Sequence, residues 1–239
     1  MPKSIAVFGA GPALGRSVAR RYAREGYSVA VVARSRDPLE ALADELRGTG
    51  ATAHAVPADL SDIDALPRVA GRIRAAVGDP DAFYYGAAAN GFIPVADLTV
   101  QRAQALMPLG VYALVGLVQE FLPAMLARGD GAILSAQGAS AVQARPHIAG
   151  GFALAAQRNY LQSLHLAVAG TGVYVGALYI GAAIERSPFH AQREAARAAG
   201  ADVPDMPTAD PDQLAGLLWT MHHTRSRPEA GYPEEILNR

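Results

Sequence analysis

Hydrophobic positions along this chain fall into two alternating patterns. Short apolar runs, several of them rich in β-branched residues, occur at 4–8, 27–33, 52–56, 81–88, 131–136 and 173–179. Longer stretches with apolar residues at helical spacing lie between them, at about 14–25, 38–47, 62–77, 99–127 and 150–169. Continuous apolar runs are typical of strands covered on both faces, and strands that alternate with helices are typical of a parallel sheet. The pattern predicts a doubly wound α/β fold in one domain, with a mostly parallel sheet of six or seven strands.

The segment 181–210 breaks this rhythm with prolines and a short Ala/Arg-rich stretch. It follows the sixth strand, and insertions beyond the carboxyl ends of parallel strands often cover the ligand of such sheets. We therefore expect a lid over residues 181–210. A last helix is expected at 213–221, and the tail around Tyr232-Pro233 lacks a strand pattern, which favours six strands over seven.

Composition narrows the class of protein. The chain has 239 residues, of which 51% are hydrophobic and 18% charged, and its net charge is −1. No basic patch stands out, so a nucleic-acid partner is not expected, and the absence of cysteine excludes disulfides and thiolate chemistry. Polar residues and Pro123 interrupt the apolar stretch 109–126, which indicates a buried helix rather than a membrane span. Because the first strand begins at Ser4, we expect no signal peptide and a cytoplasmic location.

A glycine-rich turn separates the first strand from the first helix. Gly9, Gly11 and Gly15 lie in the stretch 9–15, which also contains Ala13 and Leu14. Glycines allow a tight turn and a close approach of the backbone to a pyrophosphate, which then meets the free N–H groups of the helix. The turn predicts a nucleotide site. Flavin-binding domains begin similarly, but they carry an acidic residue after the second strand, where this chain has Arg34, and they need a longer chain.

Several landmarks in order resemble the short-chain dehydrogenase/reductase family, across most of the chain. They are the turn 9–15, Asp59-Leu60 after the third strand, the fourth strand at 81–88, the sequence 121–125 and the strand opening at 131–134. The family turn reads Thr-Gly-x-x-x-Gly-x-Gly, so Phe8 replaces the threonine and Ala13 the middle glycine. The resemblance implies that Asp59 holds the adenine amino group, that Leu60 packs beside the ring, and that Ala87 and Ala88 run along the adenosine.

Arg34 bears on the choice of dinucleotide. A carboxylate at the end of the second strand favours NAD, whereas an arginine can bind a 2′-phosphate through charge-assisted hydrogen bonds. Arg16 or Arg36 could assist. We therefore predict NADP(H) as the cofactor.

The chemistry of the family is where the sequence departs from the resemblance. Members use Asn, Ser, Tyr and Lys, with the tyrosine exchanging a proton with the substrate oxygen. The corresponding positions here are Gly110 for Asn, Gly138 or Gln137 for Ser, Gly150 or Gly151 for Tyr, and Leu154 or Ala155 for Lys. Lys3 is the only lysine and lies in the first strand, so no Tyr-x-x-x-Lys pair exists in this chain.

Two residues are candidates to replace the missing groups. His147 precedes the glycines at the tyrosine position, and Gln137 could hydrogen-bond a substrate oxygen. Tyr85 and Asn90 lie near the expected cleft, with Tyr85 expected mainly in the core, and His190 and Glu185 lie on the lid. His222-His223 has no acidic neighbour at ligand spacing, so no metal site is predicted.

Two classes of function follow from these observations. The first is an NADPH-dependent oxidoreductase without the usual proton relay, acting on a fairly large apolar substrate. The second is a catalytically inactive member that binds a dinucleotide or other ligand as a sensor or scaffold. The resemblance also implies a homodimer through the helices at 99–127 and 150–169, whose apolar positions include Val111, Leu114, Leu117, Val118, Phe152, Leu154, Tyr160 and Leu164.

Overall fold

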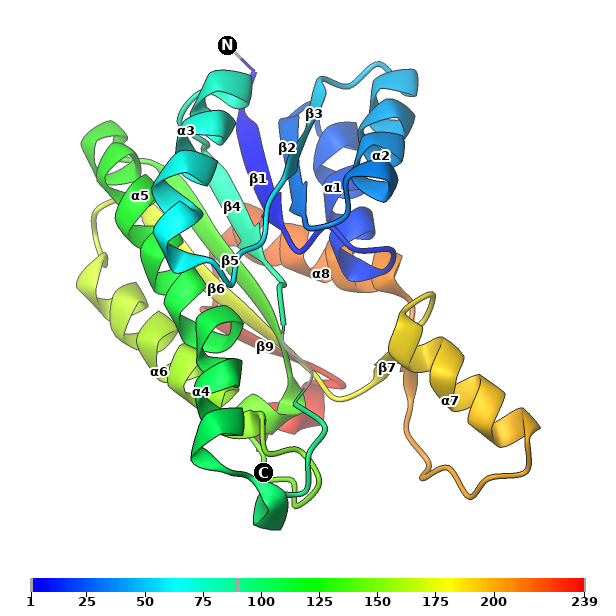
Figure 1. Ribbon diagram of the computed structural model, residues 1–239. Coiled ribbons are helices and arrows are strands. Elements are labelled where there is room, and N and C mark those ends of the chain that lie inside the picture. Colours follow the sequence, from blue (N-terminus) through cyan, green and yellow to red (C-terminus); the bar gives the residue numbers. More distant parts are fainter. Residues whose placement is uncertain (1, 89–90, 239) are drawn as a thin grey trace.

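A seven-stranded parallel sheet forms the centre of the computed structural model, which describes residues 2–88 and 91–238 (Figure 1). Its strand order is β3-β2-β1-β4-β5-β6-β9. The strands are β1 (Ser4–Phe8), β2 (Ser28–Ala33), β3 (Ala53–Pro57), β4 (Ala82–Tyr85), β5 (Gly131–Gly138), β6 (Val173–Ile180) and β9 (Glu229–Tyr232). The chain passes from β1 outward to β3 and then returns to β4 on the other side of β1. The sheet therefore has its topological switch point between β1 and β4, where ligands of such sheets bind.

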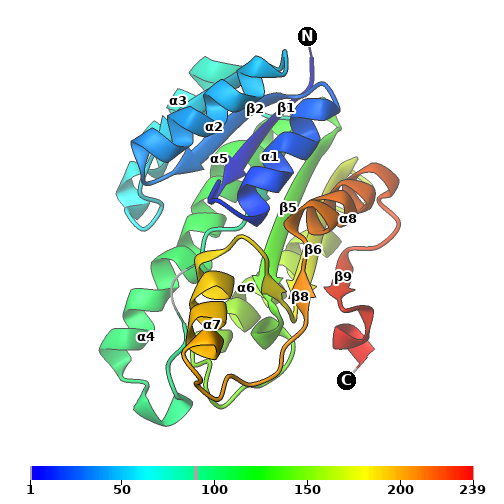
Figure 2. The same cartoon turned by 90° about the vertical axis from the view of Figure 1, so that its right-hand side faces the viewer.

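Two helical layers cover the sheet (Figure 1, Figure 2). On one face lie α3 (Leu66–Val77), α5 (Ala113–Arg128) and α6 (Gly151–Ala167), and on the other lie α1 (Leu14–Arg24), α2 (Arg36–Gly48) and α8 (Pro211–Thr224). Each layer packs on its own apolar cluster, because side chains of each strand point alternately to the two faces. The predicted doubly wound α/β fold is confirmed.

The seventh strand corrects the expectation that favoured six strands. β9 pairs in parallel with β6 from Ala177 opposite Glu229 to Ile180 opposite Tyr232. Side chains of neighbouring elements bind Glu229, the first residue of β9. Arg158 of α6 donates to both carboxylate oxygens of Glu229, at 2.9 and 3.0 Å. Tyr179 of β6 also donates its hydroxyl hydrogen to Glu229, at 2.7 Å. These tertiary contacts stabilise a strand whose own sequence carries little strand signal.

The long apolar helix predicted at 99–127 is interrupted in its middle. It consists of α4 (Val100–Met107), a π-helical turn (Pro108–Tyr112) and α5. Val100–Arg128 is long and apolar enough to cross a membrane by length and composition alone, and 39% of its most apolar window is buried in this protein. The expected dimer would use apolar residues of α5 and α6. Four of them are buried in the chain's own core and cannot contact a second copy: Leu114, Leu117, Val118 and Leu164.

The lid segment leaves the layers after β6. It contains β7 (Ala183–Ile184), α7 (Pro188–Ala198) and β8 (Thr208–Ala209), and β7 pairs with β8 as a separate two-stranded sheet. In Figure 1, α7 lies apart from the two helical layers, beyond the carboxyl ends of the strands. Arg186 holds the base of the segment to the start of α8, through Asp210 at 2.6 Å and Asp212 at 2.9 Å.

A largely buried aromatic cluster joins α1 to α8. Tyr22, Tyr27, Trp219 and His222 pack with ring centroids 5.1–6.3 Å apart, and the Tyr22 hydroxyl lies 2.8 Å from Nδ1 of His222. His222 is buried, and this burial, with the charge of Arg225 as a smaller cause, lowers its pKa to about 4. The neutral imidazole is therefore part of the folded state.

We predict that this histidine makes the fold sensitive to mild acid. The unfolded chain binds a proton at this residue below about pH 6.5, whereas the folded chain does so only near pH 4. The contribution is fully present above about pH 6.5 and is lost as the pH falls, by about 2 kcal/mol between pH 7 and pH 5. Urea unfolding at pH values between 7 and 5 should show this loss of unfolding free energy in the native chain. The loss should be much smaller in His222→Gln.

His223→Gln is the matched control, because His223 is the exposed neighbour of His222. It should keep the pH dependence of the native chain. An equal pH dependence in His222→Gln and the native chain would contradict the prediction.

Candidate functional site

The site lies at the carboxyl edge of the sheet and begins with the glycine turn. Gly9 has a φ of +85°, and a Cβ there would lie 2.7 Å from the backbone nitrogen of Ala87. A Cβ on Gly15 would lie 2.1 Å from the carbonyl oxygen of Gly9. Both glycines are required by the packing of the protein on itself, because any other residue would displace backbone. They bring β1, α1 and the end of β4 together.

Gly11 differs from these two glycines. The nearest atom to a Cβ on Gly11 is the Gly9 oxygen at 3.9 Å, so the protein's own packing would accept a side chain there. α1 begins at Leu14, and Ala13 at its N-cap gives no side-chain hydrogen bond. Among the described residues, no backbone carbonyl accepts from the N–H groups of Leu14 and Gly15. The backbone at Gly11 is therefore not covered by a side chain, and it lies beside free N–H groups at a helix N-terminus. Such a site can bind an anionic group, for example a pyrophosphate.

Arg34 and Asp59 flank this turn at the ends of β2 and β3. Both are exposed. Hydrogen bonds from the Ser61 hydroxyl and N–H, and then the positive charge of Arg34, hold the pKa of Asp59 below its usual value. Arg34 makes no ion pair with the described residues.

The two assisting arginines are already engaged. Arg16 forms a short ion pair with Glu45, and Arg36 lies 3.9 Å from Glu40. The structure therefore leaves Arg34, of the three arginines, available to an added phosphate.

The other adenosine candidates are placed differently from one another. Leu60 is buried in the core beneath α3, whereas Ala87 is half-buried and Ala88 exposed at the end of β4. Ala87 and Ala88 thus reach the same edge as the glycine turn. Asn90 lies outside the described residues.

Most of the glycines at the positions where the resemblance implies the relay are closed by packing. A Cβ on Gly110 would lie 2.8 Å from the Cβ of Ala153, and one on Gly151 would lie 2.9 Å from the carbonyl oxygen of Ser140. Gly150 packs on Gly91, with each ideal Cβ only 2.7 Å from the other's Cα. Gly151 therefore leaves no open volume for a ligand at this position. The exception is Gly138, which is exposed, and whose Cβ would meet nothing closer than 3.8 Å.

A buried polar network lies next to these glycines. Gln157 of α6 donates to the Gly110 oxygen at 2.8 Å and accepts from Ser135 at 3.3 Å. Tyr85 donates to the oxygen of Leu109 at 2.6 Å, and its burial raises its pKa far above the usual value. These bonds satisfy two carbonyls of the π-helical turn. Tyr85 is thus a structural residue, as the sequence suggested, and it is no acid near neutral pH.

Ser140 is a polar residue of the site that the sequence analysis missed. Its Oγ lies 3.8 Å from the ideal Cβ position of Gly138 and 3.5 Å from that of Gly151. It is half-buried, in a 3-10 turn (Ala139–Ala141) that follows β5. A hydroxyl therefore stands between two of the glycines. No spacing rule indicated it, because the turn that brings it there forms only after the strand ends.

The candidates chosen from the sequence lie in different environments. His147 is exposed in the turn that hydrogen-bonds to the loop after β4, where Val95 donates to the oxygen of Pro146 at 2.9 Å. Gln137 is buried near the end of β5, and neither amide atom has a hydrogen-bond partner among the described residues. His190 and Glu185 are half-buried on the lid. The structure does not bring His147 and Gln137 together into one group.

The lid contacts the body through an aromatic pair. Phe92, after β4, and Phe189 of α7 stack with ring centroids 4.8 Å apart and planes 3° from parallel. Phe92 is nevertheless 56% exposed, and α7 has no buried residue. The carboxyl edge of the sheet thus has an apolar, partly open cover.

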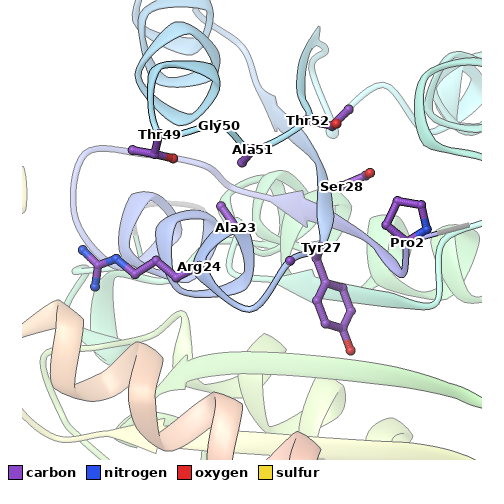
Figure 3. Close-up of a pocket in the computed structure, with 10 residues that line it drawn as sticks. Pro2, Ala23, Arg24, Tyr27, Ser28, Thr49, Gly50, Ala51 and Thr52 are labelled. Carbon is purple, nitrogen blue, oxygen red and sulfur yellow. The ribbon is translucent and has the colours of Figure 1, made fainter.

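A surface hollow of about 290 Å³ lies elsewhere, at the amino ends of the strands (Figure 3). Its lining includes Pro2, Arg24, Ser28, Thr49 and Thr52. It is at the opposite edge of the sheet from the glycine turn and is not part of the candidate site. Within residues 2–88 and 91–238, no group of three or more His, Asp or Glu side chains is arranged to hold a metal ion.

Comparisons with known proteins agree with the fold and with the family resemblance of the chain. The family model described as short chain dehydrogenase matches residues 3–195. A fatty acyl-CoA reductase of Mycobacterium tuberculosis is 32% identical over 136 residues, which cover 56% of this chain and 46% of that protein. Other mycobacterial relatives, uncharacterized oxidoreductases, are covered to 62% of their length at 26% identity. The chain thus spans less than two thirds of these curated relatives.

Two solved structures share the architecture along nearly the whole chain. The L-sorbose reductase from Gluconobacter frateurii, complexed with NADPH and L-sorbose, superimposes with a TM-score of 0.88 at 22% identity. The match covers 99% of this chain and 97% of that one. A protein of Beutenbergia cavernae described as an NAD(P)-dependent gluconate 5-dehydrogenase, with NADP bound at low occupancy, has a TM-score of 0.84 and 26% identity over the same shares.

The close packing at Gly151 generates a prediction for two single substitutions. Gly151→Ala should destabilise the protein by about 1–3 kcal/mol, because the new Cβ must displace the Ser140 backbone. Gly138→Ala should change the free energy of unfolding by less than about 1 kcal/mol, since its φ of −65° suits alanine and its surroundings are open. Urea unfolding measures both values. Equal effects of the two substitutions would contradict the prediction. They would mean that the surroundings of Gly151 accept a side chain as readily as those of Gly138.

Proposed function

Because the chain belongs to the short-chain dehydrogenase family, we propose that it binds NADP(H) and exchanges a hydride with an apolar carbonyl or alcohol substrate. The observation that carries this proposal is the glycine turn, where Gly11 leaves backbone bare beside the free N–H groups of α1. In this proposal Arg34, which is exposed after β2, binds the 2′-phosphate, and Asp59, Ala87 and Ala88 contact the adenosine. The NADPH and NADP complexes among structures of the same architecture support the choice of cofactor.

Ser140 is the residue that we place at the reacting oxygen. When bound, the dinucleotide supplies or accepts the hydride, and charge then develops on the substrate oxygen. The Ser140 hydroxyl can donate a hydrogen bond to that oxygen from its position between Gly138 and Gly151. Stacked Phe92 and Phe189 give this edge of the sheet a partly open apolar cover, which supports a fairly large apolar substrate. The proton that completes the reaction would come from solvent or from His147, which faces the solvent.

A second function is favoured by one specific observation. Gly110 and Gly151 are closed by packing, so the usual tyrosine cannot be accommodated without moving backbone, and the only lysine, Lys3, is paired with Asp130 at 3.2 Å. A protein with this site could bind dinucleotide and ligand as a sensor or scaffold without turnover. The two functions share the cofactor and differ in the rate of hydride transfer.

Location and assembly belong to the same proposal. We place the protein in the cytoplasm as a homodimer. Tyr112 and Phe152 support the dimer, because they are 48% and 41% exposed on the helices expected to pair. The partner is a second copy of this chain, with no nucleic acid and no membrane involved.

The cofactor proposal predicts a preference for NADPH over NADH. One charge-assisted contact with the 2′-phosphate contributes about 1.5–3 kcal/mol, which corresponds to a roughly ten- to hundredfold difference in affinity. Arg34→Ala should remove most of this preference in isothermal titration calorimetry. Arg36→Ala is the control, because Arg36 already lies near Glu40, and it should change the preference by less than about threefold.

Two results would count against this assignment. Equal affinity of the unmutated protein for NADPH and NADH would remove the role of Arg34. A loss in Arg36→Ala as large as that in Arg34→Ala would show a diffuse effect of positive charge instead of a specific contact.

The proposal for the reaction predicts slow and selective turnover. The rate of NADPH oxidation should be negligible with acetone as the substrate. With decanal as the substrate, the same rate should be measurable. Ser140→Ala should lower kcat/KM for decanal by about 10²-fold, as for loss of a hydrogen-bond donor to a developing oxyanion. His147→Ala should lower it less, because His147 is exposed and water can replace it.

The outcomes separate the two functions. Tight NADPH binding without any oxidation in the presence of decanal would favour the sensor or scaffold. A larger loss in His147→Ala than in Ser140→Ala would assign the proton transfer to the histidine and refute the role given to Ser140.

A further inference from the structure

The carboxamide of Gln137 is a buried polar group that the fold leaves without a partner. The residue is 5% exposed, and both Oε1 and Nε2 are inaccessible and unbonded within the described part of the chain. A buried polar atom without a partner destabilises the folded state, because the atom loses its hydrogen bonds to water and gains none in return. Such a group in a native protein therefore needs an explanation.

The neighbouring polar groups on the same face do not explain it, since they already pair with one another. Gln137 is opposite Tyr179 in the β5–β6 register, and Tyr179 donates to Glu229. Ser135, two residues earlier and therefore on the same face, donates to Gln157. None of these groups hydrogen-bonds to Gln137 within the described part of the chain.

Its place in the fold points to the cleft. The side chain lies on the α6 side of β5, one step nearer the carboxyl edge than the Ser135–Gln157 pair. The next residue is Gly138, which is exposed and carries no side chain to cover the end of the strand. Gln137 therefore lies between the Ser135–Gln157 pair and the exposed end of the strand.

Chemistry then defines the group that the amide can recognise. A carboxamide presents one acceptor oxygen beside a donor NH₂. A ligand pairs with both atoms at once when it offers a donor and an acceptor on neighbouring atoms, as another carboxamide does. A ketone or ester has acceptors only and would leave Oε1 unpaired. We propose that Gln137 recognises a carboxamide group of a bound ligand through a paired amide–amide contact, in the cleft of the proposed function on which this inference rests.

Two sources could supply such a carboxamide, the nicotinamide end of the dinucleotide or an amide on the second ligand. Calorimetry with NADPH and with 2′-phospho-ADP-ribose, which lacks nicotinamide, distinguishes the first source. If the nicotinamide is recognised, Gln137→Met should lower the affinity for NADPH about tenfold and leave that for 2′-phospho-ADP-ribose unchanged. If the second ligand is recognised, decanamide should bind about tenfold tighter than methyl decanoate, and Gln137→Met should abolish this difference.

Thermal unfolding without ligand provides an independent arm. Gln137→Met replaces an unsatisfied amide by an apolar side chain of similar shape and should raise Tm by about 2–8 °C. Gln157→Met is the matched control on the same face, and it should lower Tm because it strands the Gly110 oxygen and Ser135. A fall in Tm for Gln137→Met would show that its amide is satisfied within the fold, and would overturn the proposal.

The proposal is also overturned if Gln137→Met changes neither the NADPH to 2′-phospho-ADP-ribose ratio nor the decanamide to methyl decanoate ratio. Failure of the proposed function gives a different result. In that case neither nucleotide binds the unmutated protein, while the Tm arm and the decanamide comparison without nucleotide still decide the role of Gln137.

Discussion

The structure depends on a close backbone contact at the end of β1. Gly9 packs closely against Gly15 of α1 and against Ala87 at the end of β4. A Cβ on Gly9 or on Gly15 would not fit between these backbones. The N–H groups of Gly9 and Ala10 donate to the oxygen of Val32, at 3.0 and 3.1 Å, which attaches the same turn to β2. Two strands and a helix therefore converge on one turn. The free N–H groups at the start of α1, the arginine after β2 and the adenosine side after β4 all take their positions from it.

The other half of the site is built on a second set of close contacts. Gly91 packs on Gly150, Gly110 on Ala153, and Gly151 on Ser140. The loop after β4 and the turn before α6 are thereby joined, and Ala149 donates to the oxygen of Ile93 at 2.8 Å across the joint. Glycines at relay positions thus serve packing. The carbonyl groups of the π-helical turn are satisfied by Tyr85 and Gln157, so the buried side of the site is a stable polar network that carries no titrating acid near neutral pH.

These two halves have different chemical consequences. The first retains what a dinucleotide requires, and Arg34 is exposed and unpaired among the described residues. The second has glycines at 110, 138 and 151 and carries two uncharged groups, the hydroxyl of Ser140 and the amide of Gln137. Neutral hydrogen-bonding groups bind and orient a ligand better than they transfer protons.

Local patterns determined much of this protein. The run 4–8 followed by the glycines of 9–15 predicted the strand, turn and helix of the cofactor half, because those constraints act between residues close in sequence. The missing lysine was also certain from the sequence. The tertiary structure alone decided three features: β9, which Arg158 and Tyr179 hold through Glu229, the position of Ser140 between Gly138 and Gly151, and the orphaned amide of Gln137. Each depends on which groups from distant segments meet. A side chain's partners are set by the packing of α6, β5 and β6 together, and no single stretch of the chain contains that information.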